Sequence, residues 1–395
     1  MTSTSTSPAT PATLPGPITL RAYYFCFLAA TGVSVPFYPV YLRGLGFSGK
    51  QVSLVFAAAP LMHMLGPLVW GWATDRTRRP DVMLRLALAG AALAYVPLGV
   101  ASAFATVMCI SLFHQSFNVA LPGLSDLLAL ARVRGAGDDY GRIRIWGSFG
   151  FLVSCLLAGQ LFAWRGRRAD PIYPFLVAGL LACAFLIALH VQGRGGRERP
   201  TAADARLLLK DRRFVALVLI SAIHWACAVP YHGFFGLYIQ DRGYGTGVTS
   251  LAFATSVLSE MLAFFAFKHI QRRARLSTFM TIVTAASALR WMATGLAGNA
   301  AVLILVQAAH GLTFGLFWAA ALAWLMGCVP ERVRATGQTL FTGAVYGIGA
   351  LLGSLLCGAA YDAFGSATPL FIGGAALDAG LALFLLLRGR RLSPA

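Results

Sequence analysis

The sequence is poor in charged residues, and the two signs are unequal. Only 12% of its 395 residues are charged, with 14 Asp and Glu against 32 Lys and Arg. A soluble globular chain carries about 25% charged residues. By contrast, 58% of this chain is hydrophobic and its mean hydropathy is +0.70. These values exclude a large soluble domain and indicate an integral membrane protein.

Cysteine, metal-binding and catalytic patterns are equally sparse. The seven cysteines lie within or at the edges of apolar segments, and no two of them form a CxxC pair. We therefore expect neither a disulfide framework nor a metal site. No catalytic triad or nucleotide-binding motif stands out, so we expect no cofactor and no enzymatic activity. The basic residues occur in short loops, not along one face of a soluble helix, which argues against nucleic-acid binding.

Long apolar runs dominate what is present. A run of about 20 apolar residues is long enough to cross a bilayer as a helix. The sequence predicts an all-α integral membrane protein with twelve transmembrane helices in two pseudo-symmetric six-helix bundles, an arrangement that the motifs described below liken to the major facilitator fold. The expected helices are 18–42, 51–73, 81–100, 103–130, 143–163, 171–190, 213–238, 249–268, 276–297, 300–327, 336–360 and 368–387.

The basic residues also predict the orientation. With both termini in the cytoplasm, cytoplasmic segments hold 23 Lys and Arg residues and external loops hold 6. This asymmetry follows the positive-inside rule, so both termini should be cytoplasmic. Residues 1–17 contain no Lys or Arg and lack the charged start of a secretory signal. We expect them to form a disordered cytoplasmic tail, and residues 388–395 to form a second cytoplasmic tail.

The two halves of the chain repeat. Residues 46–65 align with 243–262 without a gap, at an offset of 197, and this alignment places His63 opposite Glu260. Two related six-span halves are typical of transporters that rock around a midplane site. An Arg- and Gly-rich stretch separates them. We therefore expect a bundle, a cytoplasmic linker and a second bundle at 18–190, 191–212 and 213–387.

Three consecutive apolar segments each carry one ionisable residue at membrane depth: Glu260, Arg290 and His310. A charged group there costs about 2.5–3.5 kcal/mol on insertion scales, so it persists where it is paired or faces water. At about 1.5 Å per residue, the three lie in one layer roughly 10–17 Å from the external ends of their spans. This arrangement predicts a proton-coupling site. The structural alternatives are a static Glu260–Arg290 ion pair and helix–helix hydrogen bonding by His310.

The loop after the second span reads GWATDRTRRP. Its glycine, acid and arginines, Gly71, Asp75, Arg76 and Arg79, resemble the loop 2–3 signature of the major facilitator superfamily. In that signature, charge pairs near helix ends latch the two halves together. The alternative is an ordinary positive-inside loop.

Asp126 and Arg144 lie near the cytoplasmic ends of adjacent spans, at similar depth. A carboxylate and a guanidinium there could pair, or could jointly hold a polar substrate by directed hydrogen bonds. In the alternative interpretation, Arg144 sets the topology and Asp126 neutralises it.

Several stretches resemble the lactose permease-like and phenylpropionate permease-like proton symporters of the major facilitator superfamily. They are PFYPVYL, DYGRIRIWGS, YHGFFGLYIQDRGYG, SALRW and QAAHGLTF, and the resemblance covers nearly the whole chain. It implies that Asp126, Arg144 and Phe151 bind the substrate. It further implies that Glu260, Arg290 and His310 couple transport to protons.

The chain also departs from the lactose permease pattern. Thr313 stands where an acid is expected, His224 and His232 replace acids in the seventh span, and Phe151 lacks the indole donor of a tryptophan. These departures favour a flatter and more apolar substrate than a sugar. We expect alternating-access symport of protons with a small aromatic carboxylate such as phenylpropionate, with Arg144 as its carboxylate clamp.

Other functions stay open. A sugar or nucleoside symporter and a proton-driven drug efflux antiporter would use the same fold, whereas a non-transporting scaffold would not need ionisable groups at one depth. The expected partners are a small-molecule substrate, protons and the lipid bilayer of a bacterial inner membrane, with the protein acting as a monomer. A second proton site at Asp378 is left open, and His63, His224 and His232 have no assigned role.

Overall fold

The computed structural model describes residues 16–136, 138–166, 169–193, 208–270, 275–330 and 333–392. Within these ranges the regular structure is helical throughout, and nine helical segments are long and apolar enough to cross a membrane. Residues 1–15 of the tail expected at 1–17, residues 194–207 of the linker expected at 191–212, and residues 393–395 lie outside the described ranges.

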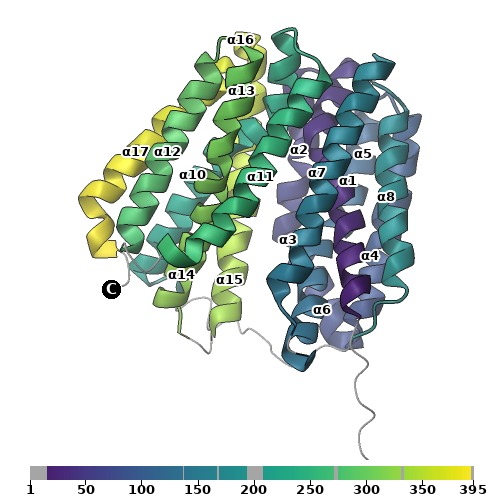
Figure 1. Cartoon of the computed structure of the whole chain (residues 1–395), viewed down its shortest axis with the longest axis horizontal. Coiled ribbons are helices and arrows are strands. Elements are labelled where there is room, and N and C mark those ends of the chain that lie inside the picture. Colours follow the sequence, from purple (N-terminus) through teal and green to yellow (C-terminus); the bar gives the residue numbers. More distant parts are fainter. Residues whose placement is uncertain are drawn as a thin grey trace, which may run out of the picture.

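The first helical group comprises the elements from α1 to α8. Figure 1 shows it on the right. Its elements are α1 (Pro17–Gly44), α2 (Gly49–Phe56), α3 (Ala58–Thr77), α4 (Pro80–Tyr95), η1 (Val96–Gly99), α5 (Phe104–Asn118), α6 (Leu121–Ala136), α7 (Tyr140–Arg165) and α8 (Ile172–Ala188).

The second helical group comprises the elements from α10 to α17, on the left of Figure 1. Its elements are α10 (Arg212–Asp241), α11 (Thr246–Ile270), α12 (Leu276–Leu296), α13 (Ala300–Val306), η2 (Gln307–Ala309), η3 (Gly311–Leu316), α14 (Phe317–Cys328), α15 (Arg334–Thr342), η5 (Gly343–Gly349), α16 (Ala350–Phe364) and α17 (Thr368–Leu392).

Each expected span coincides with one helical stretch, although the total of twelve membrane crossings stays a prediction. Nine stretches meet the length and hydropathy of a span, and α8, α11 and α12 occupy the other three expected positions. Residues 388–392 of the expected C-terminal tail continue helix α17, and the position of this tail relative to the membrane stays a prediction. Apolar residues extend α17 almost to this point, and its last turn carries basic side chains that suit a helix C-terminus.

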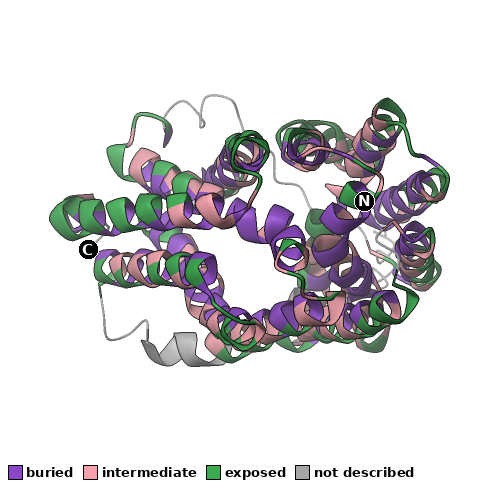
Figure 2. Cartoon of the chain, turned by 90° about the horizontal axis from the view of Figure 1, so that it is seen from above, coloured by how far each residue is buried: buried purple, intermediate pink, exposed green. Residues whose placement is uncertain are grey.

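The outer surface of both groups is apolar. Trp164, Leu93 and Leu386 are 82%, 70% and 68% exposed. Seen from above, exposed residues lie mainly on the outward sides of the helices and buried ones face inward (Figure 2). A ring of exposed apolar side chains fits a lipid environment, because no water is present in the bilayer core to make their exposure unfavourable.

The tenth and eleventh expected spans are not continuous α-helices. The tenth passes through a 3₁₀ turn, η2, and a π-helical segment, η3, and the eleventh contains the π-helical η5. In η3, a Cβ on Gly311 would lie 2.2 Å from the carbonyl oxygen of Ser259 on α11. The missing side chain therefore allows close backbone contact there, and π-helical turns of this kind occur often at functional sites.

The two groups are joined at the end opposite the termini (Figure 1). Asp362 on α16 accepts hydrogen bonds from the backbone N–H of Gly49 and Lys50 at the start of α2, at 2.6 and 2.9 Å. The hydroxyl of Thr246 on α11 donates to the carbonyl of Gly159 on α7 at 2.8 Å. These contacts close the space between the groups at one end.

Candidate functional site

Arg290 forms the centre of a buried polar cluster in the second group. It lies on α12 and is 3% exposed. Its Nε and Nη2 donate to Gln307 Oε1 at 3.2 and 2.7 Å, and its Nη1 donates to Thr313 Oγ1 at 2.9 Å. The same Nη1 lies 2.9 Å from Nδ1 of His310. Sequence analysis missed Gln307, although its spacing of three residues from His310 places both near one face of a helix.

Two aromatic faces complete the surroundings of this guanidinium. The Cζ atom of Arg290 lies 4.6 Å from the ring centre of Tyr231 and 4.4 Å from the ring centre of Trp291. A desolvated cation–π contact contributes roughly 2 kcal/mol. Arg290 is therefore held by neutral acceptors and π faces, without a carboxylate.

The hydrogen bond from Arg290 fixes the tautomer of His310. A guanidinium only donates, so Nδ1 of His310 must accept and the ring proton lies on Nε2. This Nε2 is 3.9 Å from Oε2 of Glu260, which is too long for a hydrogen bond but close enough for an electrostatic contact.

The structural alternative of a static Glu260–Arg290 ion pair is therefore not observed. Among the described residues no ion pair within 4 Å joins them, and His310 contacts both. The reason is steric and chemical: Gln307 and Thr313 lie close enough to take the guanidinium donors.

Glu260 lies near the boundary of the two groups. Its side chain is 25% exposed, and it lies close enough to Arg144 on α7, Tyr231 and Tyr346 for electrostatic interaction. A residue of the first group therefore faces the proposed coupling residues of the second.

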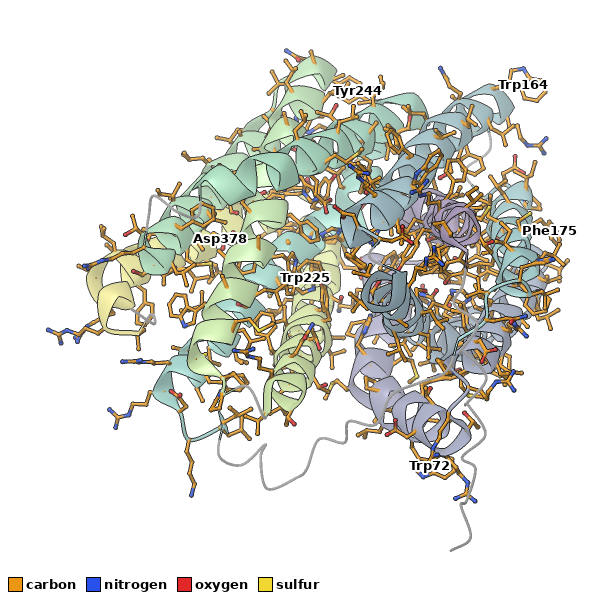
Figure 3. The ribbon with its side chains drawn as sticks, turned by 60° about the horizontal axis from the view of Figure 1, so that its bottom comes forward. Trp72, Trp164, Phe175, Trp225, Tyr244 and Asp378 are labelled. Atoms are coloured by element: carbon orange, nitrogen blue, oxygen red, sulfur yellow. The ribbon has the colours of Figure 1, made fainter. Side chains whose placement is uncertain are left out.

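An aromatic cluster adjoins Glu260. The ring centre of Tyr346 lies 4.7 Å from that of Trp225 and 4.9 Å from that of Trp318, on which it stacks. The ring of His232 stacks on Trp225, with 5.1 Å between the ring centres. His63 of the first group lies 5.8 Å from Tyr346 and so extends the cluster across the boundary. Figure 3 shows Trp225 near the middle of the molecule, far from Trp72 at its outer end.

In the first group, Asp126 is held by two tyrosines. Its Oδ1 accepts from the hydroxyls of Tyr24 and Tyr140 at 2.7 and 2.8 Å. Arg144 lies over the ring of Tyr24 at 5.5 Å, and no ion pair within 4 Å joins it to Asp126 in the described structure. Of the two possibilities given above, a direct Asp126–Arg144 pair is not observed among the described residues, and two tyrosine hydroxyls occupy one oxygen of the acid. Phe151 is half-buried and packs against the core of this group.

A cavity of about 250 Å³ lies within the first group, between α1, α3, α5 and α8. Hydroxyl, amide and imidazole groups line it, and its lining contains two ionisable histidines but no Asp, Glu, Lys or Arg. Its polar residues include Ser34, Tyr38, His63, His114, Gln115 and Asn118. Sequence analysis missed this cavity, although the polar run SLFHQSFN in an apolar span is a signal that could have revealed it.

Comparison with known proteins places this arrangement in a family. Residues 18–372 match the model of the MFS_1 like family. The chain belongs to the MFS_1 like family. It is a multi-pass membrane transporter of the major facilitator superfamily.

Its relatives transport different solutes. The transporter is 29% identical over 337 residues to a maltose permease of Geobacillus stearothermophilus, covering 85% of each chain. It is 27% identical over 343 residues to a probable 3-phenylpropionic acid transporter of Escherichia coli (strain K12), covering 84% of this chain and 86% of the relative. A crystal structure of the nucleoside transporter NupG (D323A mutant) shares the fold, with a TM-score of 0.84, 17% identity and coverage of 94% and 99%. The transporter therefore acts on a small molecule.

The arginine-rich loop of the transporter lies at the end that carries the termini. Asp75 and Arg76 are exposed, and Arg76 lies over the ring of Trp72 at 5.7 Å. Arg79 pairs with Asp81 at 3.1 Å, and this hydrogen bond raises the pKa of the Arg79 guanidinium. A Cβ on Gly71 would meet open space. These residues make no hydrogen bond or ion pair to a described residue of the second group.

Proposed function

We propose that the transporter is a proton-coupled symporter that carries a small organic solute by alternating access. One observation carries the proposal. The buried series Arg290–His310–Glu260 ends in a carboxyl group at the boundary of the two groups, within electrostatic reach of Arg144. Intramembrane ionisable groups of this kind mark proton pathways.

In the proposed cycle, a proton from the external side binds the Glu260 carboxyl and is released to the cytoplasm. A neutral carboxylic acid costs less to bury than a carboxylate, so protonation permits the groups to close around Glu260. Proton binding also removes the attraction between Glu260 and Arg144. His310, with its proton on Nε2, faces the carboxyl throughout and links it to Arg290.

Substitution of Glu260 tests the coupling. Glu260→Gln keeps the size of the side chain but cannot gain or lose a proton, so uphill uptake in proteoliposomes should disappear while downhill exchange persists. Asp138→Asn, which removes an acid that pairs with Arg132 in the loop before α7, is the control and should accumulate solute normally. Full accumulation by Glu260→Gln would refute the assignment.

The first substrate candidate is a small aromatic carboxylate such as phenylpropionate. Arg144 would clamp the carboxylate, and the cluster of Trp225, Trp318 and Tyr346 would stack on the ring. The 27% identical relative described as a probable 3-phenylpropionic acid transporter supports this candidate.

The second candidate is a neutral hydroxylated solute, a sugar or a nucleoside. The 250 Å³ cavity favours it, since its lining offers hydroxyls, amides and aromatic faces but no guanidinium or ammonium to bind a carboxylate. The maltose permease and the putative nucleoside transporter YegT of Escherichia coli (strain K12), 25% identical, support it as well.

Thermal stabilisation of the purified protein separates the two candidates. The probes are 3-phenylpropionate, maltose and uridine. Arg144→Gln should abolish stabilisation by the carboxylate only, and Asn118→Leu, which replaces an amide of the cavity lining by an apolar side chain, should weaken stabilisation by the hydroxylated probes only. Uptake of the active probe should then acidify the vesicle interior. Alkalinisation would instead favour proton-driven efflux. A multidrug resistance protein MdtG of Serratia proteamaculans (strain 568), 28% identical over 49% of this chain, supports that alternative.

The membrane arrangement is part of the proposal. We place both termini in the cytoplasm of a bacterial cell, the protein in the inner membrane as a monomer, and the bundles at 18–190 and 213–387. The closed end then faces outward, so the structure represents an inward-facing state. In the opposite state, Gly71, Asp75, Arg76 and Arg79 would latch the cytoplasmic ends of the two groups.

A further inference from the structure

A second buried polar cluster lies deeper in the second group and has no role in the proposed cycle. Asp378 on α17 is 0% exposed, and Figure 3 shows it among the helices of this group. Its Oδ1 lies 2.8 Å from Nδ1 of His224 on α10, and its Oδ2 accepts from the indole N–H of Trp291 at 3.0 Å. Nε2 of His224 lies 3.1 Å from the backbone carbonyl oxygen of Thr313.

These contacts determine how many protons the couple holds. A carbonyl oxygen only accepts, so Nε2 of His224 carries a proton. The bond between Nδ1 and Asp378 then needs one more proton, which makes the couple either imidazolium with carboxylate or neutral imidazole with carboxylic acid. Without that proton, a carboxylate would face a nitrogen lone pair at 2.8 Å. The observed geometry is therefore that of the proton-loaded couple.

At the positions that correspond through the internal repeat, the first group has apolar residues. At the offset of 197, His224 corresponds to Phe27 on α1 and Asp378 corresponds to Leu181 on α8. Phe27 and Leu181 are both buried in the apolar core of the first group. Replacing a buried polar pair by packed apolar residues is often neutral or stabilising, so the polar pair is weak evidence for a purely structural role.

Thr313 connects this couple to the first cluster. Its carbonyl oxygen accepts from His224, and its hydroxyl accepts from Arg290, which in turn donates to His310. Thr313 lies in the π-helical segment η3, a type of turn that occurs often at functional sites. A change in the hydrogen bond between His224 and Thr313 can therefore alter the hydrogen bond between Thr313 and Arg290.

We propose that Asp378 and His224 form a second protonation site, coupled through Thr313 to the Arg290–His310–Glu260 series. Its role in transport depends on the proposed function, whereas its capacity to bind a proton does not. When the proton leaves, the neutral imidazole of His224 keeps a single N–H, which can bond to the Asp378 carboxylate or to the Thr313 carbonyl but not to both. Bonding to the carboxylate ends the hydrogen bond to Thr313.

Other titratable groups surround the couple. Arg290 on α12 acts electrostatically on His224, and the thiol of Cys227 on α10 lies near Asp378. Cys357 on α16 adjoins Cys227. Infrared spectroscopy distinguishes the couple from these thiols, because S–H groups and carboxyl groups absorb in different regions.

The first test needs no solute. Infrared difference spectra of the purified protein, recorded between about pH 5 and pH 9, should contain a carboxyl signal that Asp378→Asn removes. Asp362→Asn, at the closed end, and Glu260→Gln should both leave that signal in place. Identical spectra for the wild type and Asp378→Asn would overturn the proposal, whatever the result for Glu260.

The second test follows the repeat. The double variant His224→Phe/Asp378→Leu copies the first group, so it should fold and catalyse downhill exchange of the active probe while moving fewer protons per solute. A wild-type proton ratio would overturn the coupling. If the double variant does not fold, Thr313→Val serves instead: it keeps the carbonyl and loses the hydroxyl, so it should keep the Asp378 signal and lower the proton ratio. An unchanged ratio in Thr313→Val would also overturn the coupling.

Discussion

At the scale of single residues, the transporter buries the guanidinium of Arg290 among neutral partners, and no carboxylate of a described residue pairs with it within 4 Å. Gln307 takes two of the Arg290 donors, and the side chain of Gln307 is itself fully buried. Its amide nitrogen is also used, since Nε2 donates to the Thr294 hydroxyl at 3.3 Å and the Leu303 carbonyl at 3.1 Å. Gln307 therefore orients the guanidinium toward His310 while satisfying its own polar atoms.

Gln307→Leu should destabilise the protein and impair coupling. It leaves two buried N–H groups of Arg290 without acceptors, and an unsatisfied buried donor costs about 1–3 kcal/mol, more for a charged group. We expect a lower unfolding temperature in detergent and slower uphill uptake. Gln240→Leu, near the end of α10, is the control, and equal unfolding temperatures for both variants would contradict the argument.

The sequence predicted the layer of ionisable residues but not their order of contact. Depth counted along each span placed Glu260, Arg290 and His310 together, because helical rise converts position into height. The direct contacts depend on rotamers and on the neutral partners Gln307 and Thr313, which hydropathy does not register. The contact between Asp378 and His224 could not be predicted either, because the two residues are 154 positions apart in the sequence.

At the scale of elements, apolar run length predicted where the helices lie, but it could not predict their internal breaks. Length and hydropathy are insensitive to whether a backbone N–H bonds to the fourth or the fifth preceding carbonyl. The π-helical segments η3 and η5 arise where glycines permit close backbone approach, as between Gly311 and Ser259.

Gly311→Ala should therefore disrupt the site although it removes no polar side chain. The new methyl would lie 2.2 Å from the Ser259 carbonyl oxygen, so η3 and α11 would have to separate and His310 would move relative to Glu260. We expect a loss of uphill uptake and a lower unfolding temperature. Gly179→Ala on α8 meets open space and should raise helix stability by about 0.5–1 kcal/mol. Matching behaviour of the two variants in the thermal assay would disprove this role for Gly311.

At the scale of the whole molecule, the two helical groups are held together by a helix terminus. The first N–H groups of α2 have no partner within their own helix. Ser48 and Gln51 form a capping box that satisfies part of this end, and Asp362 from the other group accepts from Gly49 and Lys50. A carboxylate beside a helix N-terminus also interacts favourably with the helix dipole. The contact exists only while this end is closed.

Asp362→Ala should therefore shift the equilibrium toward the state that is open at this end. Loss of a capping interaction costs about 0.5–2 kcal/mol, and 1.4 kcal/mol corresponds to a tenfold change in population, so roughly a two- to thirty-fold shift is expected. Spin labels at Leu54 on α2 and Leu356 on α16, in a background without native cysteines, would report it as a longer distance population. Asp139→Ala is the control: Asp139 accepts from the backbone N–H groups of Gly141 and Arg142 at the start of α7, so this cap lies within the first group. An unchanged distance distribution in Asp362→Ala would show that packing between the groups, not this cap, keeps the end closed.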